Sequence, residues 1–411
     1  MSVLVCLPMS PPPAAPRVRR CSEQPPGRGA LPLVGRAVAT PARFPPLPRF
    51  VYALPVLLAA LLVGCASDSH DLSLPQNRAL RDCINAANAM RAGEYDRAKA
   101  ELDDALPLMG GIIANDADAR RARRLFFGEE AGKTFIGEPY ERVMAFYYRG
   151  ILYWRDGELD NARACFRSAQ FQDADVEHHE YASDYVLLDY LDGYLTAKLG
   201  GDGSDMLARA RTNARGSSPP PYHVPANVMC FIEFNHGPVK FAAGNYGELL
   251  RVRPGGGDVQ SVTVRLAEQQ FPLVPYDDLF FQASTRGGRE MDHILAGKAV
   301  FKGTTDTLGT AAIFSGIGLA AADKGEAGAI VAGAGVLTKL IAAAVTPDAD
   351  TRVWYNLPQF LTFAALQLPP GSHTVMVDFK SATGQTLLTR EATFSVSESG
   401  RDVVLFFSSI P

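Results

Sequence analysis

The chain has 411 residues, 47% of them hydrophobic and 20% charged, with a formal net charge of −4. A chain of this length and composition can bury a sizeable core and is expected to form two or three domains. Its near-neutral charge, with no basic tract after residue 65, gives no electrostatic footprint for nucleic acid, so no nucleic-acid partner is expected.

Cysteine usage argues against a disulfide framework and against a zinc site. Three of the six cysteines lie at or before residue 65, and the three that follow are an odd number without CxxC spacing. The later ones are Cys83, Cys165 and Cys230. Cys83 and Cys165 lie on helical patterns and are interpreted as small core residues.

An uncharged apolar run covers residues 50–64. It is short for a membrane-spanning helix, which needs about 20 apolar residues, but it fits the apolar core of a secretory signal, typically about 7–15 residues long. Arg43 and Arg49 supply the positive flank. Residues 1–48 are rich in Pro and Arg and lack apolar periodicity, which favours a disordered extension or a start codon placed too far upstream. Residues 1–64 are therefore predicted to be a leader and signal peptide.

The end of this run resembles the lipobox of bacterial lipoproteins. Leu62, Gly64 and Cys65 match that motif, whereas Val63 departs from it because a small residue is usual there. The resemblance implies that the thiol of Cys65 receives a diacylglycerol, that the preceding peptide is removed, and that the new amino terminus is acylated, for example with palmitate. Ala66 rather than Asp follows, which resembles lipoproteins sorted to the outer membrane, so a lipid anchor on its periplasmic face is expected.

Residues 65–215 are predicted to form a helical domain, because apolar residues recur there at intervals of three and four. The clearest unit, residues 146–174, places small and aromatic residues at the spacings of a tetratricopeptide repeat, which is a pair of packed helices. Gly150 would let the two helices approach closely. Tyr153 and Phe166 would fill the space between them.

Two weaker copies of this repeat flank the clearest one. A third copy over residues 185–214 keeps Gly193 but loses register afterwards, as an end cap would. About three repeats are the minimum for a stable stack, so the count is sufficient. The earlier copy places matching residues at Ala86, Ala89, Gly93, Tyr95, Ala98, Leu102 and Ala105.

A Ser/Pro-rich break over residues 216–227 is predicted to be a linker, and the pattern beyond it changes to that of strands. Short strands separated by turns predict a β-sandwich-like domain over residues 228–411, and hence an α+β protein. The expected strands cover residues 228–234, 259–266, 279–283, 362–368, 373–379, 386–396 and 402–407.

A Gly/Ala-rich segment over residues 308–345 interrupts this β-rich part, after a short helix expected over residues 289–301. Its small residues would allow two helices to approach closely. Two interpretations stay open for the segment: a buried or self-packed helical pair, or a hairpin that contacts the membrane.

Three stretches of the sequence resemble a known family. The first is Gly-Glu-Pro-Tyr-Glu-Arg over residues 137–142, together with residues 148–150, and the second is residues 295–299. The third is Asp-Thr-Arg over residues 350–352, with the Trp, Leu and Pro that follow it. The combined pattern resembles a family of poorly characterised bacterial lipoproteins with a repeat-containing N-terminal half. The resemblance implies a lipoprotein that faces the periplasm. It brings no established reaction.

The sequence offers little that suggests catalysis. Asp350, Arg352 and Trp354 could form a charge pair with a stacked aromatic ring, but an anchor between the Gly/Ala-rich segment and the sandwich is favoured, because a buried arginine needs a partner for structural reasons alone. The neighbouring histidines in residues 178–180 would point in different directions on a helix. We therefore expect no catalytic residue, no metal and no cofactor.

These observations predict a non-enzymatic scaffold or adaptor, tethered through Cys65, that binds a protein partner through the concave face of its helical repeats, as repeat solenoids do. A setting in envelope assembly follows from the expected location. The alternative is an envelope glycan-binding protein or hydrolase that uses the C-terminal domain near the charge pair described above. The candidate contact residues of the repeats are Tyr147, Arg149, Tyr153 and Tyr185.

Overall fold

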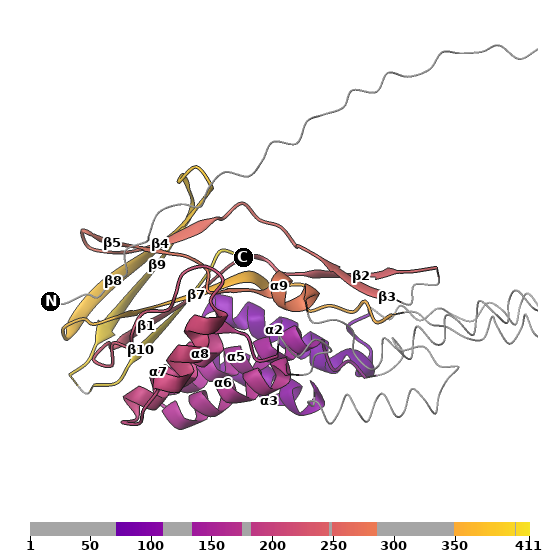
Figure 1. The fold of residues 1–411 in the computed structure, drawn as a ribbon, viewed down its shortest axis with the longest axis horizontal. Helices are drawn as coiled ribbons and strands as arrows, with labels where there is room; N and C mark the ends of the chain where they lie inside the picture. The colour runs from indigo at the N-terminus through magenta and orange to yellow at the C-terminus, as the bar shows by residue number, and fades with distance from the viewer. Residues whose placement is uncertain (1–70, 110–133, 175–181, 246–248, 286–348, 399) are drawn as a thin grey trace, which may run out of the picture. The chain divides into compact units, whose positions relative to one another are not determined.

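The computed structural model shows helices first and strands after them, which confirms the α+β class (Figure 1). The leader with Cys65, the helix expected at 289–301 and the Gly/Ala-rich segment at 308–345 lie outside the described part of the chain. The structure describes residues 71–109, 134–174, 182–245, 249–285, 349–398 and 400–411.

The helices of the first half come in antiparallel pairs that are joined by short turns. Gly93 and Gly157 end the first helices of two pairs in the left-handed conformation, with φ of 75° and 84°. That conformation is accessible to glycine at no steric cost. The helices are α2 (Arg78–Ala92), α3 (Tyr95–Met109), α5 (Pro139–Asp156), α6 (Leu159–Asp173), α7 (Val186–Lys198) and α8 (Ser204–Asn213), with a 3₁₀ turn, η2 (Pro75–Asn77), before α2.

Close approach within a pair depends on small residues at the crossing. A Cβ atom added to Gly150 of α5 would lie 2.7 Å from Cε1 of Phe166 on α6. Ala162 and Phe166 are fully buried, as are Ala98 and Leu102 on α3. These four residues are in the core, as the repeat pattern predicted, whereas Tyr153 is only half-buried.

The strands form three sheets, which we name A, B and C. Sheet A has the order β10-β1-β7-β6, sheet B pairs β2 with β3, and sheet C has the order β5-β4-β8-β9. In sheet A, β1 runs antiparallel to β7 and parallel to β10. The strands are β1 (Val228–His236), β2 (Val239–Ala243), β3 (Leu249–Arg253), β4 (Ser261–Leu266), β5 (Gln269–Leu273), β6 (Asp277–Asp278), β7 (Pro358–Leu366), β8 (Gly371–Lys380), β9 (Thr386–Val396) and β10 (Val403–Ser408).

Most of the expected strands are confirmed, but the strand expected at residues 279–283 is wrong. That stretch is the helix α9 (Leu279–Ser284). The side chain of Asp278 accepts a hydrogen bond from the backbone N–H of Phe280 at 2.9 Å and so caps the first turn. A short apolar run fits a strand and a helix equally well, and here the preceding aspartate decides for the helix.

Sheet A is buried on both faces. Phe231 of β1 points to the helices and belongs to a core that also contains Tyr147 and Trp154. The neighbouring residues Cys230 and Ile232 belong to a second core, shared with sheet C. One face of sheet A therefore covers the helices, and the other face packs on sheet C.

Candidate functional site

The helical face that was expected to receive a partner is covered by the protein's own sheet A. Tyr147 is 1% exposed, and its ring centroid lies 6.2 Å from that of Phe231 in β1. Tyr185 is fully buried. A direct contact between either tyrosine and a partner would require this core to open, so we do not retain them as contact residues. The repeat pattern alone could not show which neighbour covers the face.

The other two candidate contact residues belong to an interhelical bridge. Nε and Nη2 of Arg149 donate to the carboxylate of Asp103 at 2.7 and 3.1 Å, which ties α5 to α3. The guanidinium also lies 3.6 Å from the centroid of the half-buried Tyr153 ring. These contacts give Arg149 a structural role, because they hold α5 to α3.

The segment around Asp350 and Arg352 forms a buried ion pair. Nη2 of Arg352 donates to Oδ2 of Asp350 at 2.6 Å, and its Nη1 donates to Oδ1 of Asn77 at 2.8 Å. Burial acts to raise the pKa of Asp350, but the hydrogen bonds and charge of Arg352 outweigh it and hold that pKa below its ordinary value. Arg352 is 1% exposed, so its guanidinium is enclosed by the described residues.

A second buried ion pair is joined to the first. Nζ of Lys240 in β2 donates to Oε2 of Glu141 at 2.5 Å and to the backbone oxygen of Arg352 at 2.9 Å. Oε1 of Glu141 accepts from the backbone N–H of Trp354 at 2.8 Å. We call Glu141, Lys240, Asp350 and Arg352 the polar junction. Two of the stretches that carry the family resemblance, 137–142 and 350–352, meet there, and the geometry is that of an anchor.

A third buried charge fixes β1 to the helices. Glu233 accepts from Nε of Arg91 on α2 at 2.8 Å and from the hydroxyl of Tyr148 on α5 at 2.5 Å. Burial and the neighbouring carboxylate raise the pKa of Tyr148 well above its ordinary value. These contacts satisfy a carboxylate that would otherwise be costly to bury, and they set the position of sheet A on the helices.

A groove of about 680 Å³ lies where the end of α2 faces the outer strands β9 and β10. Arg91 lines it from α2, Arg390 and Ala392 from β9, and Phe406 and Ser408 from β10. Nε of Arg390 donates to the backbone oxygen of Ser408 at 3.1 Å. We call this cavity the β10-edge groove. Its volume falls in the usual range for ligand sites, about 300–1,000 Å³.

The backbone of β10 is available along this groove. The N–H of Val403 donates to the oxygen of Asn227 next to β1, at 2.8 Å. Backbone groups of successive residues point to opposite edges of a strand, so those of Val404 and Phe406 point away from β1. No strand within the described residues pairs with this outer edge.

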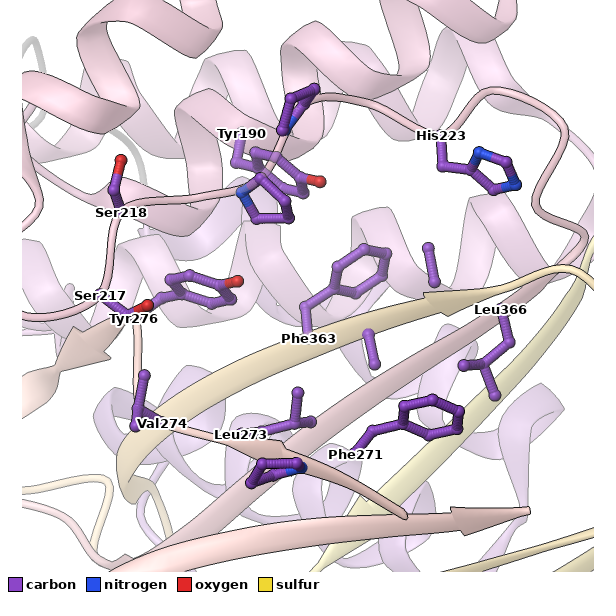
Figure 2. Close-up of a pocket in the computed structure, with 15 residues that line it drawn as sticks. Tyr190, Ser217, Ser218, His223, Phe271, Leu273, Val274, Tyr276, Phe363 and Leu366 are labelled. Atoms are coloured by element: carbon purple, nitrogen blue, oxygen red, sulfur yellow. The ribbon is translucent and has the colours of Figure 1, made fainter. Parts of the chain in front are cut away.

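A smaller pocket of about 110 Å³ lies at the other side of sheet A (Figure 2). Tyr190 of α7, Phe271 of β5 and Phe363 of β7 line it, together with the proline-rich residues 217–221. We call it the β7-edge pocket. Residues 216–227 were expected to act as a linker; the structure places part of this stretch in the wall of a cavity.

The free cysteines show no sign of activation. Cys83 and Cys230 are buried, and Cys165 is partly buried. Burial raises the pKa of Cys230 to about 12 and that of Cys165 to about 11. Thiols with a raised pKa carry little thiolate at neutral pH and are poor nucleophiles.

Comparison with known protein families, curated proteins and solved structures finds no match for this chain. Within the described ranges, no group of His, Cys, Asp or Glu side chains is placed to hold a metal ion. Among the helices of the same residues, none combines the length and the apolar character that crossing a membrane requires.

The two cavities were not predicted from the sequence, although most of the elements that line them were. The strand at 362–368 and the strand at 402–407 were both expected, but a sequence pattern does not tell whether a strand lies at the edge of a sheet. The proline-rich stretch at 216–227 was a visible signal. Prolines beside a strand edge are one way in which proteins protect such edges.

Proposed function

We propose that the protein is a lipid-anchored scaffold on the periplasmic face of the outer membrane, and that it binds an extended segment of a partner protein in the β10-edge groove. Cys65 is the anchor in this proposal. The observation that carries it is the outer edge of β10, which no strand of the described ranges pairs with, beside a groove of about 680 Å³. A partner segment would add to sheet A as a further strand, a common mode of peptide recognition.

The chemistry of the groove suits a peptide backbone. Val404 and Phe406 direct N–H and C=O groups toward the edge, and an added strand would pair with both. Groove and segment would thus meet through main-chain hydrogen bonds.

The helices belong to this proposal as tetratricopeptide-like repeats. Gly93 and Gly157 end α2 and α5 in the same conformation, and the buried Ala98 and Ala162 follow them at the same spacing. This agreement supports a repeated helix pair, with α7 and α8 as the cap. In this chain, however, sheet A covers the repeat face. The sheets A and C, which share a core, would be the β-sandwich-like part.

Site-specific photo-crosslinking in cells tests the binding site. A photo-reactive amino acid replaces either Ala392, which lines the groove, or the exposed neighbour Thr393, which points to the opposite face of β9. We expect a crosslink to one polypeptide from position 392 and none from position 393. Ala392→Trp should abolish co-purification of that polypeptide, whereas Thr393→Trp should not. Equal crosslinking from both positions would overturn the proposal.

Mass spectrometry of the mature N-terminal peptide tests the anchor separately. The expected species begins at Cys65 and carries a diacylglycerol and an acyl group. A protein that retains residues 1–64 with an unmodified Cys65 thiol would remove the membrane location from the proposal, and with it the envelope setting.

A further inference from the structure

The β7-edge pocket lies on the backbone edge of a strand. Phe363 and Ala365 pack with the helix-side core, whereas Ala364 and Leu366 pack with the core shared with sheet C. All four residues line the pocket. A cavity that contacts side chains from both faces of one strand must lie beside that strand, at its edge.

Within the described residues, no strand pairs with this edge over the second half of β7. In the described residues, β6 pairs only with Phe360 and Leu361. The backbone oxygen of Leu361 accepts from the N–H of Tyr276 at 2.9 Å, which shows that Leu361 points to this edge. By alternation, the N–H and C=O groups of Phe363 and Ala365 point the same way. The C=O of Phe363 and the N–H of Ala365 are therefore an acceptor and a donor on one rim of the pocket.

Aromatic side chains form part of the pocket wall. Tyr190 and Tyr276 lie nearly parallel, with an angle of 19° between their rings and 6.3 Å between the centroids, and Phe271 closes the far side (Figure 2). A volume of about 110 Å³ is several times the ~10–15 Å³ that one water molecule requires. A flat ring could stack on these aromatic side chains in place of water.

We call the proline-rich residues 217–221 the strap. Their position beside the pocket makes this edge of β7 different from an edge that binds a peptide. His223, at the end of the strap, is held by a hydrogen bond between its Nε2 and Oε1 of Gln367 at 2.8 Å, and by the hydroxyl of Tyr194, which donates to its backbone oxygen at 2.6 Å. Nε of Arg211 donates to the backbone oxygen of Pro219 at 3.0 Å. With the strap fixed, the space beside β7 suits a small molecule better than a whole added strand.

We propose that the β7-edge pocket binds a small planar molecule of one or two fused rings that carries a hydrogen-bond donor and an acceptor side by side. The donor bonds to the C=O of Phe363 and the acceptor to the N–H of Ala365, while the rings lie among Tyr190, Tyr276 and Phe271. This site is independent of the β10-edge groove and of the partner proposed there.

Calorimetric titration of the purified full-length protein with the bicyclic lactam carbostyril tests the site. Carbostyril carries an adjacent N–H and C=O, and N-methylcarbostyril lacks the donor. We expect saturable one-to-one binding of carbostyril and about tenfold weaker binding of the N-methyl compound, because the latter cannot donate a hydrogen bond to the C=O of Phe363. The amide resonance of Ala365 should shift on binding.

A pair of matched alanine variants locates the site. Ala365→Leu places its added atoms in the pocket and should abolish binding, whereas Ala242→Leu, the same change at an exposed strand position in sheet B, should not affect it. Absence of saturable binding by the wild-type protein overturns the proposal. So does equal binding of the two lactams, or binding that survives Ala365→Leu. Displacement of carbostyril by a peptide that pairs with β7 would also overturn it in favour of strand addition.

Discussion

The two faces of sheet A differ from its two outer edges in how far the other described residues cover them. Both faces are sealed: Phe231 packs against the helices and Ile232 against sheet C, and Glu233 is buried with Arg91. The edges of β10 and of the second half of β7 have no strand partner within the described residues and lie beside cavities. The buried contacts on the two faces stabilise the fold, and the two edges are the surfaces to which our two proposals assign binding.

The largest expected effect concerns the polar junction that holds one sealed face. Glu141→Gln removes the charge that compensates Lys240, whose side chain is 2% exposed. An uncompensated buried charge costs about 3–5 kcal/mol of the free energy of unfolding. Denaturant unfolding of the variant measures this loss. Glu141→Gln combined with Lys240→Met should recover part of it, because no charge is then left alone.

A matched control for the junction is the pair between Arg97 and Glu94, whose side chains are 57% and 53% exposed. Glu94→Gln should cost only about 0–1 kcal/mol, since solvent screens such a pair. Equal losses from Glu141→Gln and Glu94→Gln would contradict the sealed interface.

The next effect is a pH dependence at β6, where sheet A meets α7. Burial raises the pKa of Asp277 to about 7, against hydrogen bonds from the backbone N–H groups of Leu187 and Val186. Between about pH 4 and 7 the folded protein binds a proton that the unfolded chain has released, so stability falls as pH rises, by about 1.4 kcal/mol per unit at most. Unfolding of the wild type and of Asp277→Asn across this range measures it; the variant should lose the slope. Identical slopes would show that Asp277 does not titrate there.

A smaller loss is expected where two helices cross beneath the sheet. Gly150→Ala places a methyl group against the ring of Phe166, and such overpacking costs about 1–3 kcal/mol. Gly216→Ala is the control, because no atom lies within 4 Å of the added Cβ. Thermal unfolding of both variants gives the comparison, and an undiminished melting temperature for Gly150→Ala would mean that the helices are further apart.

The edges should tolerate substitutions that the faces do not. Ala365 and Ala392 line the two cavities, but each also packs partly against a core, so Ala365→Leu and Ala392→Trp should each cost about 1 kcal/mol, the lower end of the range for overpacking. Chemical unfolding of both variants is the measurement. A loss above about 2 kcal/mol in either one would show that its cavity is packed in solution.

The elements that were predicted correctly from the sequence are those in which apolar residues recur at a regular interval. The strand expected at 386–396 has the bounds of β9, because half-exposed residues alternate there with exposed ones. The short strands β2 and β5 were missed: Lys240 in the first and Pro272 in the second interrupt the pattern. Charged residues are usually exposed, but Lys240 is buried because Glu141 lies opposite it in the fold. No local sequence pattern reveals that contact.

The candidate site was harder to predict than the fold. The aromatic and small residues of the repeat were placed correctly in a helical core, yet Tyr147 and Tyr185 were assigned to a partner although sheet A buries them. Which surface covers a helix depends on contacts between residues far apart in sequence, such as the one between Arg91 and Glu233. The free edges of β7 and β10 depend equally on sheet order, which the sequence pattern does not encode.

Residue-resolved amide hydrogen exchange on the unliganded protein tests the central claim most directly. The account predicts that the amides of Ile232 in β1 and Ala364 in β7, which bond to each other's strand, exchange only on global unfolding. The amides of Ala365 and Phe406, which point to the free edges, should exchange orders of magnitude faster. Equal protection of the inward and outward amides would contradict the claim that these edges are open for recognition.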